Sequence, residues 1–132
     1  MNHEFRLAVA LCNHIKLQYP AIVRDARWFA IPNGELRNKI TAGKLKRSGV
    51  LPGVSDYLLS SPSGQYKQLW LEIKHDVGKV SHDQKSFLLH HNSDWEMALV
   101  GYGYTENKYI IDTWRKGAAH ELEWMRDCPG KR

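Results

Sequence analysis

Apolar positions near the start of the chain recur with the period of an α-helix. With Asn2 available as a cap and Pro20 as a stop, they predict a helix over residues 3–18. The apolar positions that carry this pattern are Phe5, Ala8, Val9, Cys12 and Ile15. A shorter apolar run, residues 28–31, closes at Pro32-Asn33-Gly34 and predicts a strand that enters a turn.

The middle of the chain predicts a hairpin. Two strand candidates, residues 54–60 and 67–74, flank the turn-forming segment 61–65. After them we expect a helix from Ser81 to about residue 92, a strand over 96–100 and a helix over 105–116 that ends at Gly117. This αβββαβα order predicts an α/β domain around a mixed β-sheet.

The length of 132 residues, with 42% hydrophobic and 25% charged residues, indicates one globular domain over 1–132. We expect residues 118–132 to form an exposed C-terminal tail, in which Leu122, Trp124 and Met125 could supply interface area. No segment is long and apolar enough to cross a membrane, and the first residues do not resemble a secretion signal. Two scattered cysteines, Cys12 and Cys128, provide neither a disulfide framework nor a zinc cluster, so we expect a cytoplasmic protein.

The net charge of +5 is concentrated in one segment. Residues 24–47 contain seven basic side chains against Asp25 and Glu35, and the rest of the chain is nearly balanced. The seven are Arg24, Arg27, Arg37, Lys39, Lys44, Lys46 and Arg47. Such a segment is either an ordinary solvated surface or a binding site for the phosphate backbone of a nucleic acid.

The hairpin would bring two carboxylates together. If it is centred on Gly64, Asp56 lies opposite Glu72, with Cβ atoms roughly 4.5 to 5.5 Å apart. Because side chains alternate along a strand, Glu72 shares a face with Lys74, and the apolar neighbours of both point the other way. Opposed like charges are unfavourable on a sheet, and a divalent metal ion would provide a reason to keep them.

These motifs resemble a known nuclease group. Gly53-Val54-Ser55-Asp56 followed by Glu72-Ile73-Lys74 resembles the PD-(D/E)XK superfamily, with Ser55 in place of the proline. Together with residues 31–34, 49–53 and Lys79-Val80-Ser81-His82-Asp83-Gln84, they resemble the virus-type replication-repair nuclease (VRR-NUC) domains, in the small stand-alone form of phages and bacteria. The resemblance covers residues 3–105 and implies a restriction-endonuclease-like fold.

The resemblance also implies metal-dependent phosphodiester hydrolysis. Asp56, Glu72 and the backbone carbonyl of Ile73 would hold Mg²⁺ or Mn²⁺, whose preferred ligands are oxygens. Lys74 would position or deprotonate a water, or stabilise the transition state; alternatively, it only bridges the two carboxylates.

Two further site residues have competing interpretations. Glu4 matches a helical glutamate that faces the metal site in the family, but an acid in a first helical turn also interacts favourably with the helix dipole. Gln84 matches a catalytic-site glutamine, but Ser81-x-x-Gln84 is also a capping box.

The resemblance thus implies a magnesium- or manganese-dependent, structure-specific DNA endonuclease of phage or bacterial DNA repair, similar to a Holliday-junction resolvase and acting as a homodimer on branched DNA. The alternatives are a flap or single-strand nuclease, or a non-catalytic DNA-binding module with the same fold. The residues expected to bind nucleic acid are Arg37, Lys39, Lys44, Lys46, Arg47, Lys79 and Ser81.

Overall fold

A computed structural model describes residues 3–32 and 39–126 of the chain; for residues 39–42 it describes the backbone only. The elements follow in the order α1 (His3–Gln18), α2 (Pro20–Arg24), β1 (Trp28–Ala30), α3 (Lys39–Arg47), β2 (Tyr57–Leu59), β3 (Gln68–Lys74), α4 (His82–His90), β4 (Glu96–Tyr102), α5 (Gly103–Arg115) and the 3₁₀ helix η1 (Ala119–Arg126).

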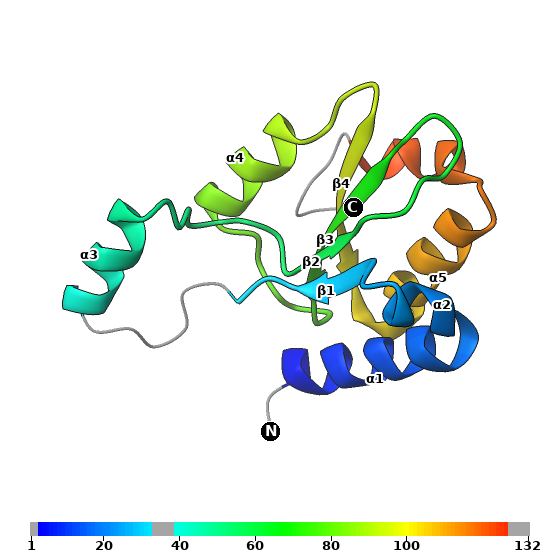
Figure 1. Ribbon diagram of the computed structural model, residues 1–132, viewed down its shortest axis with the longest axis horizontal. Helices are drawn as coiled ribbons and strands as arrows, with labels where there is room; N and C mark the ends of the chain where they lie inside the picture. Colours follow the sequence, from blue (N-terminus) through cyan, green and yellow to red (C-terminus); the bar gives the residue numbers. More distant parts are fainter. Residues whose placement is uncertain (1–2, 33–38, 127–132) are drawn as a thin grey trace.

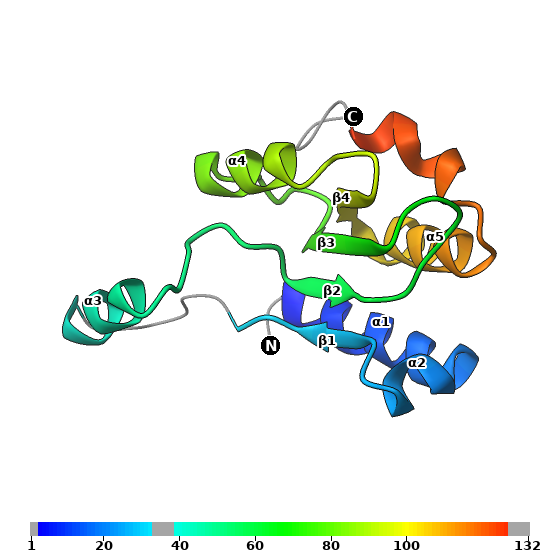
Figure 2. The same cartoon turned by 45° about the horizontal axis from the view of Figure 1, so that its top comes forward.

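The four strands form one mixed sheet in the order β1-β2-β3-β4. β1 pairs with β2, and β2 with β3, in antiparallel fashion. β3 and β4 run parallel and are joined by α4 as a crossover. The α/β class with a mixed sheet is therefore confirmed. Figures 1 and 2 show α4 on one face of the sheet and α1 with α2 on the other.

The main core fills the space between the sheet and the helices α1 and α5, with Leu69, Leu71 and Ile73 pointing into it from β3. A smaller cluster under α4 contains Leu88, Ala98 and Val100, with Trp70 packed against it. β3 is thus covered on both faces, and the alternation predicted for residues 69–74 is confirmed.

Helix α1 has the predicted bounds but a different buried face. Leu7, Leu11 and Ile15, four residues apart, are buried, whereas Phe5 and Val9 are exposed. The apolar positions outnumber those that one helix face can bury, so the sequence pattern alone left the rotation of the helix open.

Three helices were not predicted: α2, α3 and η1. Pro20 ends α1 as expected but also begins α2, because proline is well tolerated at the first position of a helix. The basic segment, expected to be a loop, contains α3, which Figure 1 shows standing away from the sheet.

The prediction of an exposed tail over residues 118–132 is wrong for residues 119–126, which form η1. In η1, Leu122 and Met125 are almost fully buried in the main core, and Trp124 is exposed. Burial at positions 119, 122 and 125 follows the three-residue period of a 3₁₀ helix, which places one side of η1 against the core.

No helix in the described part of the chain is long and apolar enough to cross a membrane.

Candidate active site

The hairpin has the predicted register. Tyr57 pairs with Leu71 and Leu58 with Trp70, which places Asp56 opposite Glu72 at the end of the β2–β3 ladder. β2 is shorter than the expected strand 54–60 because the Asp56 side chain, rather than the main chain, takes the next hydrogen bond: its Oδ2 accepts from the Ile73 amide at 2.9 Å. The Asp56 carbonyl accepts from the Ile31 amide on the β1 side at 2.8 Å. Asp56 is therefore held from both neighbouring strands.

Glu72 is buried, with 2% of its surface exposed. Burial, and then the charge of Asp56, raise the pKa of the Glu72 carboxyl well above its usual range, while Lys74 opposes the shift. Burial also raises the pKa of Asp56, against the lowering effect of the Ile73 amide. Two adjacent carboxylates that are both difficult to ionise are stabilised by a shared proton or by a cation.

One oxygen of Glu72 is without a partner in the part of the chain that is described. Oε2 accepts from the Gln84 side-chain amide at 3.0 Å and lies 3.5 Å from Lys74 Nζ, whereas the buried Oε1 has no hydrogen-bond partner. A buried, unpaired carboxylate oxygen is costly. It therefore fits a position where a cation would complete the coordination.

Gln84 combines the two interpretations that the sequence left open. Ser81 caps α4 through its hydroxyl, which accepts from the Gln84 amide, and Gln84 Oε1 accepts from the Ser81 amide at 2.8 Å, completing a capping box. The nitrogen of the same carboxamide, Nε2, donates to Glu72 Oε2. The cap fixes the side chain, and the fixed side chain points at the carboxylate.

Gly53 explains how the first turn of α4 comes so close to the hairpin. Its φ of +88° is in the left-handed region, and a Cβ there would lie 2.5 Å from the main chain of Asp83. The sequence included Gly53 in a motif but did not reveal this contact, because residues 53 and 83 meet only in the folded chain.

Glu4 lies at the rim of the site. Its Oε2 is 3.8 Å from His75 Nε2, one residue beyond Lys74, and its charge makes a minor contribution to the raised Asp56 pKa after burial. Glu4 is aligned with the buried face of α1, since Leu7 and Leu11 lie three and seven residues further along. The fold therefore brings Glu4 to the same end of the sheet as Asp56 and Glu72.

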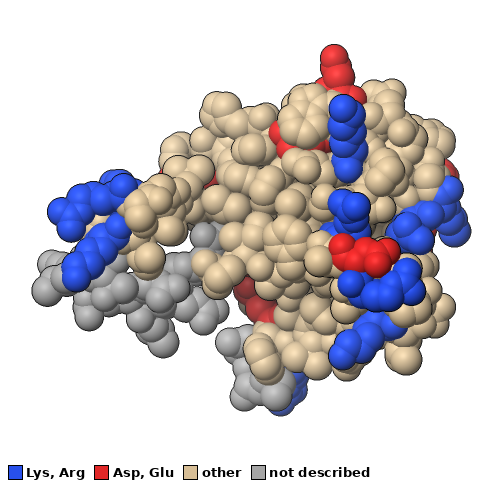
Figure 3. All heavy atoms as spheres, in the orientation of Figure 1, with Lys and Arg blue, Asp and Glu red and all other residues tan. Residues whose placement is uncertain are grey.

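The expected nucleic-acid-binding residues are more dispersed. Lys44, Lys46 and Arg47 are exposed on α3, whose basic side chains project at one end of the molecule in Figure 3. Lys79 is exposed just before α4, and the Ser81 hydroxyl is engaged in the cap. Arg37 lies outside the described residues, and only the backbone of Lys39 is described.

Within residues 3–32 and 39–126, no group of three or more histidine, cysteine, aspartate or glutamate side chains could hold a metal ion. The oxygen atoms at the end of the hairpin are those of two side-chain carboxylates, Asp56 and Glu72, and of the adjacent main chain.

A solved structure described as a "VRR_NUC domain protein" superposes on this chain with a TM-score of 0.73; the match has 23% sequence identity and covers 86% of this chain and 88% of that one. No family model matches the sequence, and no curated protein does. The chain thus has the fold of a VRR_NUC domain protein over most of its length, which confirms at the level of fold the resemblance seen in the motifs.

Proposed function

We propose that this chain is a VRR-NUC nuclease that hydrolyses phosphodiester bonds in DNA with a divalent metal ion. The observation that carries the proposal is the buried pair Asp56–Glu72, placed beside an amine and an amide at the end of a hairpin. A purely structural role explains this pair poorly, because burial and mutual repulsion oppose the ionisation of both carboxylates.

Asp56, Glu72 and the backbone carbonyl of Ile73 would hold Mg²⁺ or Mn²⁺. The donor set consists of oxygens, which suits these ions, and the unpaired Glu72 Oε1 supports it. Bound there, such an ion supplies Lewis acidity: it lowers the pKa of water and offsets negative charge on a phosphate. Glu4 at the rim is a candidate for a further ligand.

The chain's own side chains orient the reactants. Gln84 holds Glu72 Oε2 and so leaves Oε1 free. Lys74, buried with its Nζ beside Glu72, can position or deprotonate a water molecule or stabilise developing negative charge on the phosphate. Gln84 and Lys74 therefore complete the catalytic set with Asp56 and Glu72.

DNA is the proposed substrate because of the placement of the basic residues. α3 contains Lys39, Lys44, Lys46 and Arg47 without an acidic residue, and it is inserted in the chain between β1 and Asp56. Together with Arg37, Lys79 and Ser81, these residues would contact the phosphate backbone on both sides of the carboxylates. Branched DNA and a homodimer in the cytoplasm of a phage-infected or bacterial cell follow from the resemblance to stand-alone VRR-NUC domains.

The test is cleavage of a labelled panel of four-way junction, flap, single-stranded and duplex DNA, in Mg²⁺, Mn²⁺ or EDTA. We expect metal-dependent cleavage with the highest rate on the junction. The matched control is Asp94→Ala, which removes an exposed carboxylate just before β4, at the end of the sheet opposite Glu72 and Lys74. Cleavage that persists in EDTA, or wild-type protein that binds DNA and cuts none of the panel in either metal, would contradict the proposal and favour a non-catalytic module.

A further inference from the structure

Glu96 is a buried carboxylate that the proposed reaction does not use. It begins β4, is 5% exposed, and pairs in register with Gln68 at the opposite end of β3 from the catalytic residues. Its Oε1 accepts from the Trp70 indole at 2.8 Å and from the Gln68 amide at 2.9 Å, and its Oε2 lies 3.0 Å from His91 Nδ1. Both carboxylate oxygens of Glu96 therefore have side-chain partners.

This group of side chains is attached to the last turn of α4. His91 is the C-cap of the helix, and its ring stacks on Phe87 with the centroids 4.1 Å apart. Phe87 in turn packs edge-on against Trp70, at 5.1 Å. Glu96 thus binds both the strand, through Trp70, and the helix, through His91.

The contacting residues lie on one face of α4. Gln84, Phe87 and His91 are separated by three and four residues, so they share a face of the helix. Gln84 and His91 are about 10 Å apart along the helix axis, at 1.5 Å per residue. On β3, Trp70 and Glu72 point to the same side, about 7 Å apart. Gln84 meets Glu72 at one end of this interface, and His91 meets Glu96 and Trp70 at the other.

We infer that Glu96, His91 and Trp70 are positioning residues: they hold α4 at the place along β3 where the Gln84 amide reaches Glu72 Oε2. The end of α4 is also tied to β4, through Leu88 and through Asn92, whose side chain bonds the Ala98 main chain. Glu96 with His91 and Trp70 adds the tie to β3, and a small displacement along β3 would break the single hydrogen bond of 3.0 Å between Gln84 and Glu72. The inference rests on the proposed function, in which Glu72 is a metal ligand.

A double-mutant cycle tests this. Glu96→Ala should lower kcat for DNA cleavage about 10- to 100-fold with a smaller change in KM, since of the proposed DNA-binding residues only Lys79 and Ser81 lie at the start of α4. In a Gln84→Ala background the same substitution should cause no further loss, because the contact through which it acts is already gone. Glu96→Gln, which keeps an acceptor for Trp70, should restore most of the rate, and Trp70→Phe should lose part of it. An equal loss in both backgrounds would overturn the inference.

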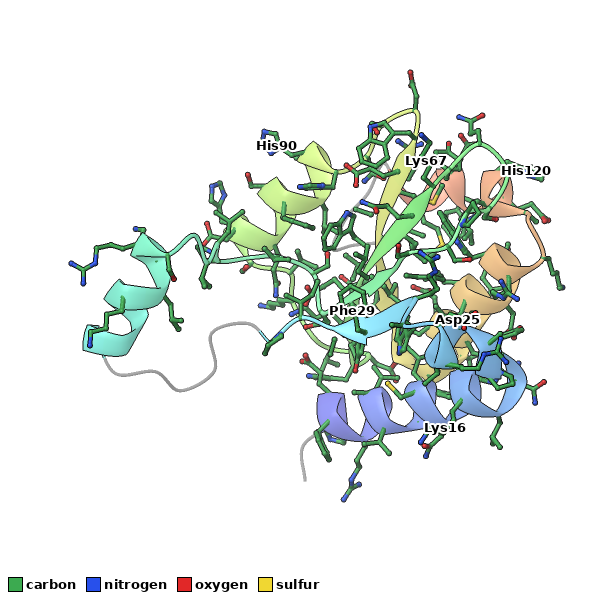
Figure 4. The ribbon with its side chains drawn as sticks, viewed as in Figure 1. Lys16, Asp25, Phe29, Lys67, His90 and His120 are labelled. Atoms are coloured by element: carbon green, nitrogen blue, oxygen red, sulfur yellow. The ribbon has the colours of Figure 1, made fainter. Side chains whose placement is uncertain are left out.

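His90→Ala is the matched control. His90 adjoins His91, but it is exposed, bonds the Ser86 carbonyl of its own helix, and lies on the outer side of α4 in Figure 4. We expect His91→Ala to reduce kcat and His90→Ala to leave it unchanged. Equal rates for both variants would contradict a positioning role for His91.

A second measurement does not depend on cleavage. The side-chain amide signal of Gln84 in nitrogen-15 NMR spectra of the metal-free protein is identified by its absence in Gln84→Ala. It should shift in Glu96→Ala and His91→Ala, and stay in place in His90→Ala. If the wild-type protein cleaves no DNA, this shift still decides the inference; an unchanged signal in folded Glu96→Ala would overturn it.

Discussion

The side chain of Gln84 donates its amide to Glu72 Oε2 at 3.0 Å. Its carbonyl oxygen is held by the Ser81 backbone, so the bond to the carboxylate belongs to the N-terminal cap of α4 as well as to the candidate active site. Stability of the helix and orientation of Glu72 are linked in one residue.

Substitutions at Gln84 should separate these two roles. Gln84→Glu keeps an acceptor for the Ser81 amide but places a carboxylate against Glu72, so we expect loss of most cleavage activity with the cap retained. Ser81→Ala removes the capping hydroxyl and a proposed phosphate contact, so it should cost about 1 kcal/mol of unfolding free energy and weaken DNA binding, while most of the cleavage rate at saturating DNA persists. Urea denaturation and cleavage rates of both variants check this; an active Gln84→Glu enzyme would show that the contact with Glu72 is dispensable.

Substitutions of the two carboxylates and of Lys74 should have different effects on metal binding and on cleavage. Asp56→Ala and Glu72→Ala should each remove most activity and most Mn²⁺ affinity, because each deletes a proposed ligand. Lys74→Ala should still bind Mn²⁺ but lose rate, since its proposed role concerns the water or the transition state. Calorimetric titration with Mn²⁺ alongside cleavage assays distinguishes the cases. Near wild-type rates in either carboxylate variant would refute the assignment, and loss of metal binding in Lys74→Ala would indicate a structural role.

The metal-free protein should become more stable as the pH falls from about 8 to about 5. Burial raises the pKa of Glu72 in the folded state above the ordinary value of 4.5, so the folded state binds more protons than the unfolded state between these two pKa values. The unfolding free energy therefore decreases as the pH rises through that window. Glu72→Gln removes the titrating group and should flatten this dependence.

Above the window, Glu72→Gln should be more stable than the wild type, by about 1.4 kcal/mol for each unit by which the pKa of Glu72 is raised on folding. Chemical denaturation at several pH values in EDTA measures both effects. A Glu72→Gln variant with the same pH dependence as the wild type would show that this carboxyl does not have a raised pKa.

The basic side chains of α3 should make DNA binding sensitive to salt. Replacing Lys44, Lys46 and Arg47 with Gln should weaken binding to all DNA structures and reduce the slope of log K against log salt by up to about 0.9 per lost phosphate contact. The matched control neutralises Lys16, Lys67 and Lys116, which are exposed outside α3; Figure 4 shows Lys16 and Lys67 far from α3. If the two triple variants have the same slope, α3 is ordinary solvated surface.

A homodimer on a four-way junction should make paired incisions. Mixing wild-type protein with excess Asp56→Ala protein, after subunit exchange, should convert the linear product of a cruciform plasmid into nicked circles, because a mixed dimer carries one active site. Gel analysis against the inactive fraction measures this. A monomer by sedimentation with DNA bound, or faster cleavage of flaps than of junctions, would replace the resolvase-like proposal with a flap nuclease.

Local pattern determined much of the hairpin. Alternation along residues 67–74 was sufficient to predict which side chains of β3 face the main core. The predicted register, with Asp56 opposite Glu72, is also the observed one, although the turn itself pairs Ser63 with Tyr66 and is not centred on Gly64. The reason is that side chains alternate with a period of two, so a register shifted by one residue would turn the apolar face of the strand away from the core. The start of α4 was likewise readable, because a capping box is a local motif.

Tertiary structure decided what depends on distant residues. The rotation of α1, the burial of Leu122 and Met125 and the close approach of Gly53 to Asp83 each require knowing what packs against these positions, and the sequence pattern does not contain that information. The simultaneous contact of Gln84 with Ser81 and Glu72 is of the same kind. The sequence named the polar groups of the site, but their protonation depends on burial, and burial is a property of the whole fold.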